Sequence, residues 1–373
     1  MKKILIYYGP KNGFESEVSA QRITLTELLR DSEFKRNMLR VVTNPDEEIQ
    51  NKQKEFISNL VIYSEEYAGL SESGLQNFIS ILELYNIQNL YMQNPPLQIH
   101  QKFETSYGKV LKVKKYTYNS ITKDRFLKIY EEFSESIIGQ DSVRDKILRA
   151  LYPLLKSDEN KPLVIMLYGK SGVGKTETAK FISNILDQKL FRKQFSMFQN
   201  QEFSTYLFGG NNSQNCLAKD LLERESNVIL LDEFDKANPV FYTAFYQLFD
   251  EGIFEDKNYR VDLNNTIIIC TSNYEDEKDI LNHLGAPIFY RFHKLIKFNE
   301  LESIDKINLI DRILNEKYSK LDKDEQEYLD IEYLINALKQ NISEIHNVRQ
   351  ISNLIDDYIN SKLVKNYIIK HTK

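Results

Sequence analysis

A glycine-rich segment from Gly169 to Thr176 carries the residues whose spacing points most directly to chemistry. It fits the pattern G-x-x-x-x-G-K-[ST] at every specified position. An apolar run over residues 163–168 precedes it, and a helical pattern follows it. The glycines let the backbone curl so that successive N–H groups point into one concavity, and the positive end of the helix adds to that field. The segment therefore predicts a phosphate-binding loop between a buried strand and a helix.

The side chains of this loop predict which phosphates and which metal it holds. Lys175 would reach the β- and γ-phosphates as a point charge, and the Thr176 hydroxyl would ligate Mg²⁺. We expect a nucleoside triphosphate to contact the loop and the residues beside it. These residues are Gly169, Ser171, Gly172, Val173, Gly174, Lys175, Thr176 and Glu177.

Two further apolar segments end in polar side chains that complete a hydrolytic site. The segment 227–233 ends in Asp232, which would organise Mg²⁺ through its water shell, and Glu233, which would orient and polarise the attacking water. The alternative is a strand that ends in solvated acids. A third predicted strand, 266–271, leads to Asn273, which would hydrogen-bond the γ-phosphate and the water. On its own, such a strand end is usually only a turn.

Composition limits the classes of protein that fit. The chain has 373 residues and a mass of 44.0 kDa, enough for two or three domains. A formal net charge of -5 and a pI near 5.8 argue against a dedicated nucleic-acid binder. Cys216 and Cys270 have no metal or redox spacing, which favours a reducing cytoplasm. No apolar run approaches the roughly 18 residues of a membrane span.

Residues 1–118 predict a separate small α/β domain with a parallel sheet, used for partner recognition. Its loop at 9–13 follows the first strand, where such folds bind ligands, but it has no phosphate-binding pattern, and a surface turn is the simpler interpretation. Helical periodicity runs over 23–29, and an amphipathic helix is expected from Ser73 to Tyr85. The expected strands are 4–8, 39–42, 60–63 and 89–92, with an edge strand at 110–113. Two helices, 125–133 and 143–155, then lead to the phosphate loop.

Taken together, residues 134–360 resemble a Clp-type (heat-shock 100 class) AAA+ ATPase, specifically the second ATPase module of the two-ring disaggregases. The segment 136–140, Ser-Ile-Ile-Gly-Gln, is similar to the family's box before the first helix. The segment 230–239 is similar to its Walker B region, and 245–273 follows the family pattern to the strand that ends at Asn273. The resemblance implies that Ile137 and Ile138 line an adenine pocket.

The resemblance also implies a fold and two functional arginines. The fold is an α/β AAA+ P-loop parallel-sheet domain at 119–299 with a helical lid at 300–373, preceded by the α/β domain at 1–118. Arg291 lies where the family carries its arginine finger, which reaches the γ-phosphate of a neighbouring subunit, and Arg349 lies where it carries its second sensor. ATP and Mg²⁺ are the implied cofactors.

One departure from the family keeps two functions open. The family's Gly-Tyr-Val-Gly pore loop, which grips a polypeptide, is replaced by a shorter polar segment at 210–217 without an aromatic residue. The first hypothesis is an ATP-hydrolysing, hexamer-like ring in the cytoplasm that remodels or regulates a protein partner. The second is a nucleotide-switched scaffold or sensor that does not thread polypeptide. A nucleic-acid-dependent ATPase fits least well, because the only basic residue at 210–220 is Lys219.

Overall fold

The computed structural model describes residues 1–30, 54–156, 161–197, 201–345 and 347–371. The chain divides into two compact units, each made of segments that are separate in the sequence. Unit 1 comprises Met1–Asn119, Phe198–Asn227 and Val240–Asn264, and unit 2 comprises Ser120–Met197, Val228–Pro239 and Asn265–Lys373. The division into 1–118, 119–299 and 300–373 stays a prediction. In the part of the chain that is described, no helix has both the length and the apolar character to cross a membrane.

The centre of unit 2 is a five-stranded sheet in which every strand runs parallel to its neighbours. Its order is β12 (Lys294–Lys297), β6 (Leu163–Tyr168), β11 (Ile267–Ser272), β8 (Val228–Asp232) and β7 (Phe191–Gln194). The three middle strands are buried at every residue, as their uninterrupted apolar runs predict. Since the strands are parallel, their carboxyl ends meet at one edge of the sheet.

Amphipathic helices cover this sheet and supply the rest of its core. Helices α6 (Lys123–Ser136), α7 (Asp141–Leu151) and α8 (Lys175–Ile185) bury Phe133, Ile147 and Ile182 against the strands. The helix predicted at 143–155 ends earlier, because its last residues form a 3₁₀ turn, η2 (Tyr152–Leu155), that contains Pro153. Proline has no N–H to continue an α-helical ladder.

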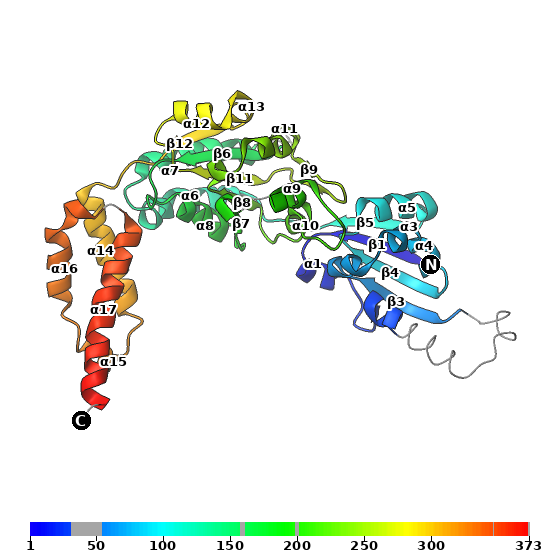
Figure 1. Cartoon of the computed structure of the whole chain (residues 1–373), viewed down its shortest axis with the longest axis horizontal. Helices are drawn as coiled ribbons and strands as arrows, with labels where there is room; N and C mark the ends of the chain where they lie inside the picture. Colours follow the sequence, from blue (N-terminus) through cyan, green and yellow to red (C-terminus); the bar gives the residue numbers. More distant parts are fainter. Residues whose placement is uncertain (31–53, 157–160, 198–200, 346, 372–373) are drawn as a thin grey trace. The chain divides into compact units, whose positions relative to one another are not determined.

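The last part of unit 2 is helical, as the lid prediction requires. Its main helices are α14 (Ser303–Tyr318), α16 (Ile331–Gln340) and α17 (Val348–His371), and α14 packs against both of the others (Figure 1). They bury their own core, which includes Ile310, Leu334 and Ile355. The short helix α15 (Lys323–Gln326) and the turn η6 (Ile342–Glu344) complete this region, whereas the short helices α12 (Glu277–Leu284) and α13 (Ala286–Phe289) precede it, between β11 and β12.

Unit 1 contains a second five-stranded sheet, and all of its strand pairs are also parallel. The order is β2 (Ile23–Thr24), β3 (Phe56–Ile62), β4 (Asn86–Gln93), β1 (Lys3–Tyr8) and β5 (Leu111–Lys115). The predicted small parallel sheet is therefore confirmed, with β5 at its edge. The strand expected at 39–42 lies outside the described residues. Ile23, expected in a helix, lies in a strand, and helical backbone starts at Leu25.

The single helix predicted from Ser73 to Tyr85 is wrong in detail. The structure has two short helices, α3 (Glu72–Gln76) and α4 (Phe78–Leu82), separated at Asn77. The Asn77 side chain donates to the Ser73 carbonyl at 3.1 Å, and its backbone leaves helical geometry at ψ 18°. Asparagine competes in this way with the regular backbone ladder. The buried faces of both helices, with Leu75, Phe78 and Leu82, still match the predicted apolar face.

The rest of unit 1 consists of short helices and a β-hairpin. Residues Ile253–Glu255 (β9) and Arg260–Asp262 (β10) pair in antiparallel register. The helical elements are α1 (Lys11–Glu15), η1 (Ser64–Gly69), α5 (Leu97–Tyr107), α9 (Gln201–Phe208), α10 (Leu217–Leu222), η5 (Pro239–Phe245) and α11 (Tyr246–Glu251).

Candidate functional site

The phosphate loop has the curled backbone that its glycines predict. Gly169, Gly172 and Gly174 have φ of 129°, 78° and 108°, in the region that side chains disfavour. A Cβ at Gly172 would lie 2.6 Å from the Asn347 Cβ, so a side chain there would also collide with the helical region. The loop ends at Gly174, which caps α8. The N-terminus of α8 therefore faces the concavity of the loop, where it favours an anion.

Lys175 is the buried cation of the site. Its side chain is 7% exposed, and its Nζ donates to the carbonyls of Gly169 at 2.5 Å and Lys170 at 2.7 Å and to Asn273 Oδ1 at 3.1 Å. Burial in this position lowers the pKa of Lys175 to about 8, from an ordinary value of 10.5. Lys175 and Asn273, which the sequence predicts in one site, are thus in direct contact.

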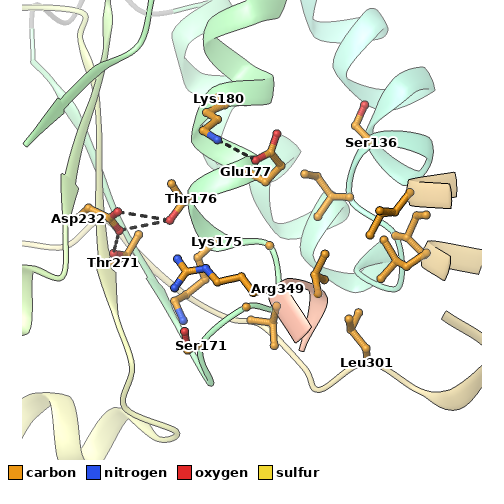
Figure 2. Close-up of a pocket in the computed structure, with 18 of the residues that line it drawn as sticks. Ser136, Ser171, Lys175, Thr176, Glu177, Lys180, Asp232, Thr271, Leu301 and Arg349 are labelled. Carbon is orange, nitrogen blue, oxygen red and sulfur yellow. Dashed lines mark hydrogen bonds and ion pairs between the residues drawn. The ribbon is translucent and has the colours of Figure 1, made fainter. Parts of the chain in front are cut away.

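Asp232 lies at the carboxyl end of β8 and is 5% exposed. The Thr271 hydroxyl donates to its Oδ1 at 2.5 Å, and the Thr176 hydroxyl is 3.4 Å from the same atom (Figure 2). Arg192, on β7, forms a two-pronged ion pair with Oδ2, from Nε at 3.0 Å and Nη2 at 2.6 Å. A buried carboxylate needs such partners, because desolvation without them is costly.

Glu233 follows Asp232 in a strained backbone conformation that directs its side chain. Its φ is 53°, which is uncommon for a residue with a Cβ. Its backbone N–H donates to Thr271 Oγ1 at 2.9 Å, and Gln194 Nε2 donates to its carboxylate at 3.1 Å. Two neighbouring strands therefore fix both ends of this residue. Its carboxylate lies at the strand edge next to Asp232, and its role toward a water stays a prediction.

Lys175, Asp232 and Glu233 line one cavity of about 510 Å³, a size suited to a nucleotide. Ile137 and Ile138 contribute to an apolar wall, as the resemblance implies. Leu301, Leu309 and Ile313 add to that wall, with Leu301 on the side away from Asp232 (Figure 2). The cavity is thus polar at the strand ends and apolar at the opposite side, which matches a phosphate chain joined to a base.

The two predicted arginines differ in position. Arg349 lines the cavity, and its side chain points toward Lys175 (Figure 2). Arg291 is not among the lining residues, and its Nη1 donates to the Pro287 carbonyl at 2.5 Å. Every other residue predicted for the site lines the cavity except Gly169, whose carbonyl accepts from Lys175. The role of Arg291 in a neighbouring subunit stays a prediction.

Several lining residues were not predicted from the sequence. Arg192 and Gln194 lie on β7, a half-buried edge strand whose three consecutive polar residues give no apolar run. Thr271 lies on β11, next to β8, in a segment that the sequence predicts only as a strand. Arg312, on α14, donates to the carbonyls of Glu135 and Ser136, and so ties the helical region to the end of α6. The strand register pairs Gln194 with Asp232, and it pairs Cys270 with Leu231, one residue before Thr271 and Asp232. A register argument could therefore have placed Gln194 and Thr271 beside Asp232.

The donor set fits Mg²⁺. The Thr176 hydroxyl and the Asp232 carboxylate are hard oxygen ligands within 3.4 Å of each other. Mg²⁺ is typically held by one or two protein oxygens together with substrate phosphates and water. The described residues contain no group of three or more histidine, cysteine or acidic side chains that could hold a metal ion.

Comparisons with known proteins agree with this geometry. Residues 160–329 match the family described as AAA domain (Cdc48 subfamily). The chain is 26% identical over 273 residues to the chaperone protein ClpB of Mycoplasma genitalium, covering 66% of this chain and 38% of that protein. It is 30% identical over 225 residues to the ATP-dependent Clp protease ATP-binding subunit ClpL of Staphylococcus aureus, covering 54% and 32%.

A solved structure shows the same fold. A chain from the closed-state cryo-EM reconstruction of Hsp104 with ATPγS and FITC casein matches with a TM-score of 0.55 and 14% identity, covering 98% of this chain and 88% of that one. The parallel sheet, the phosphate loop and the acidic strand end define a AAA+ P-loop ATPase module. The matched relatives are Clp proteins, so the chain is similar to the Clp-type, heat-shock 100 class. The chain spans about a third of the length of these curated relatives.

Proposed function

We propose that the chain hydrolyses ATP by attack of water on the γ-phosphate. The observation that carries this proposal is the meeting of Lys175, Asp232, Glu233 and Asn273 at one strand edge, beside a cavity with an apolar wall. Bound Mg²⁺ would neutralise charge on the phosphates. Thr176 and Asp232 would hold it, directly and through water.

The protein side chains divide the remaining work. Lys175 holds the β- and γ-phosphates, and Arg349 and Asn273 contact the γ-phosphate from the helical region and from the end of β11. Glu233 orients the attacking water and accepts its proton as the bond forms. Gln194 positions the Glu233 carboxylate, because it already donates to one of the carboxylate oxygens.

We further propose that the protein works as a ring-like homo-oligomer, with Arg291 of one copy completing the site of the next. Arg291 does not line the cavity of its own chain, which suits a residue that acts in a neighbour. The client would be a protein recognised by residues 1–118, and the setting cytoplasmic. The chaperone names of the relatives support this proposal.

A second candidate is a nucleotide-controlled scaffold that assembles without threading polypeptide. The segment 210–217 supports it, because polar contacts order this segment: Gln214 Oε1 accepts from the Asn211 backbone, and Asn258 Nδ2 donates to the Gly210 carbonyl. Small polar groups transmit little force to a passing chain. An unfolding assay with a tagged folded protein separates the two functions, since ATP-dependent unfolding is expected only of a threading motor.

Glu233→Gln tests hydrolysis itself. The amide cannot accept the proton, so we expect turnover to fall at least about 100-fold while ATP affinity stays unchanged. The matched control is Glu332→Gln, an exposed position on α16 outside the cavity, which should keep full turnover. Wild-type turnover in Glu233→Gln would contradict the assigned role.

The proposed assembly has its own test. Particle mass is measured with and without a non-hydrolysable ATP analogue, for the parent chain and for Arg291→Ala. We expect the parent to assemble and turn over ATP, and Arg291→Ala to lose turnover while still binding ATP. A parent chain that stays monomeric at saturating nucleotide and still hydrolyses ATP at full rate would refute the shared site.

A further inference from the structure

Unit 1 contains a second cavity, of about 480 Å³, at the carboxyl edge of its parallel sheet. Parallel α/β folds bind ligands at this edge, outside the strand ends. The charged and hydrogen-bonding residues that line it include Tyr8 at the end of β1, His100 on α5, Lys115 at the end of β5, Arg224 after α10, and Arg260 and Asp262 on β10. The cavity shares no residue with the nucleotide cavity of unit 2.

Arg224 is the unusual member of this set. Its side chain is 5% exposed, and its guanidinium lies 4.2 Å from the centre of the Tyr118 ring. Within the described part of the chain, the one hydrogen bond of its side chain runs from Nη1 to the Leu221 carbonyl at 2.7 Å, and its buried Nε has no acceptor. No described carboxylate forms an ion pair with it. A buried cation with so few partners is destabilising, and burial lowers the pKa of Arg224.

The neighbouring charges do not supply the missing anion. The Asp262 carboxylate is already used, since Lys115 Nζ lies 2.8 Å from its Oδ2 and the Asn264 backbone donates to its Oδ1. Arg260 pairs with Glu255 outside the lining, at 3.5 Å. Three cationic side chains therefore line the cavity against one carboxylate. The cavity carries a positive balance that favours an anion.

The remaining walls are apolar or hydroxyl-bearing. Leu97, Leu222, Ile253 and Val261 line the cavity together with three tyrosines. Tyr8 forms a 2.6 Å hydrogen bond with His100 Nδ1, and burial lowers the pKa of His100, which keeps the imidazole neutral at pH 7. Such walls favour a ligand with an apolar or aromatic group over an inorganic ion alone.

We propose that this cavity binds a small organic anion, a carboxylate or phosphate ester with an apolar or aromatic body, and that Arg224 pairs with its charged group. The site is independent of the proposed ATP hydrolysis. A failure of one proposal therefore leaves the other standing.

The test uses the full chain carrying Lys175→Ala, so that the phosphate loop does not compete for the probes. Calorimetry measures binding of phenyl phosphate, benzoate and the neutral benzyl alcohol at up to about 10 mM, which detects a Kd near 1 mM. We expect at least one anion to bind with one site per chain and benzyl alcohol not to bind. Phenyl phosphate alone would assign a phosphate ester, benzoate alone a carboxylate, and both a less selective anion site. Binding of neither anion, or equal binding of benzyl alcohol, would overturn the proposal.

Two added substitutions tie the binding to this cavity. Arg224→Met should raise the Kd of the anion by about tenfold or more. If that variant does not fold, Lys115→Gln decides, because Lys115 is exposed and its replacement should fold while weakening the anion about threefold. Unchanged affinity in a folded Arg224→Met, or in Lys115→Gln where that variant decides, would contradict the assignment.

Discussion

The lowered pKa of Lys175 predicts how the stability of the protein depends on pH and how many protons it takes up when ATP binds. Burial lowers its pKa to about 8 in the structure, while the unfolded chain keeps the ordinary value of 10.5. A drop of this size corresponds to about 3 kcal/mol against the charged form. Between pH 8 and pH 10.5 the unfolded chain keeps a proton on Lys175 that the folded chain has lost. The free energy of unfolding should therefore rise with pH across this range. Below pH 8 both states are charged and the contribution is flat.

ATP should reverse this shift. A phosphate beside the Lys175 ammonium favours the charged form and raises its pKa. At pH 8 about half of the free protein has a neutral Lys175, so the protein should take up about half a proton for each ATP that binds. At pH 7 the uptake should be about a tenth of a proton. MgATP is itself fully ionised at pH 8 and supplies none of this change.

The assay is titration calorimetry of MgATP in two buffers of different ionisation enthalpy, such as HEPES and Tris, at pH 7 and pH 8. The observed enthalpy should depend on the buffer at pH 8 and much less at pH 7. Lys175→Arg stays charged and should lose the uptake. Lys170→Ala removes an exposed lysine of the same loop, which pairs with Glu300, and should keep it. Tight binding at pH 8 with no proton uptake would refute the argument.

Two further substitutions test the contacts around the acidic strand end, and a third tests the backbone of the phosphate loop. Gln194→Ala should lower kcat about tenfold with an unchanged KM for ATP, since Glu233 loses the donor that positions its carboxylate. Arg192→Ala removes a cation that competes with Mg²⁺ for Asp232, so the Mg²⁺ concentration needed for half-maximal turnover should fall about tenfold. A magnesium titration of the turnover rate checks this, and an unchanged half-maximal Mg²⁺ concentration would contradict it. Gly174→Ala should cost about 2 kcal/mol of unfolding free energy in urea melts, because its φ is 108°.

The sequence predicts those parts of the fold in which one physical term dominates. Strands β6, β8 and β11 are apolar throughout because both of their faces are buried. The phosphate loop is equally clear, because its glycines adopt backbone angles that other residues disfavour. For these elements, local pattern and tertiary structure agree, so Lys175, Asp232 and Asn273 could be placed in one site before their contacts were known.

The unpredicted parts are those in which two effects compete. Strand β7 lies at an edge and is half-buried, so its polar residues Arg192 and Gln194 resemble a surface strand until the parallel register with β8 brings them to Asp232 and Glu233. The apolar wall formed by Leu301, Leu309 and Ile313 is hidden for another reason. Its residues have the spacing of any amphipathic helical region, and only the packed structure distinguishes cavity lining from core.

The contacts within the cavity also say what nucleotide binding must do. Lys175 is held by two loop carbonyls and Asn273, and Asp232 by Thr271, Thr176 and Arg192. A triphosphate that enters exchanges these partners for its own oxygens, so its affinity reflects the difference between two sets of polar contacts. Because the present partners come from three neighbouring strands and the loop, that exchange acts on the ends of β7, β8 and β11 together.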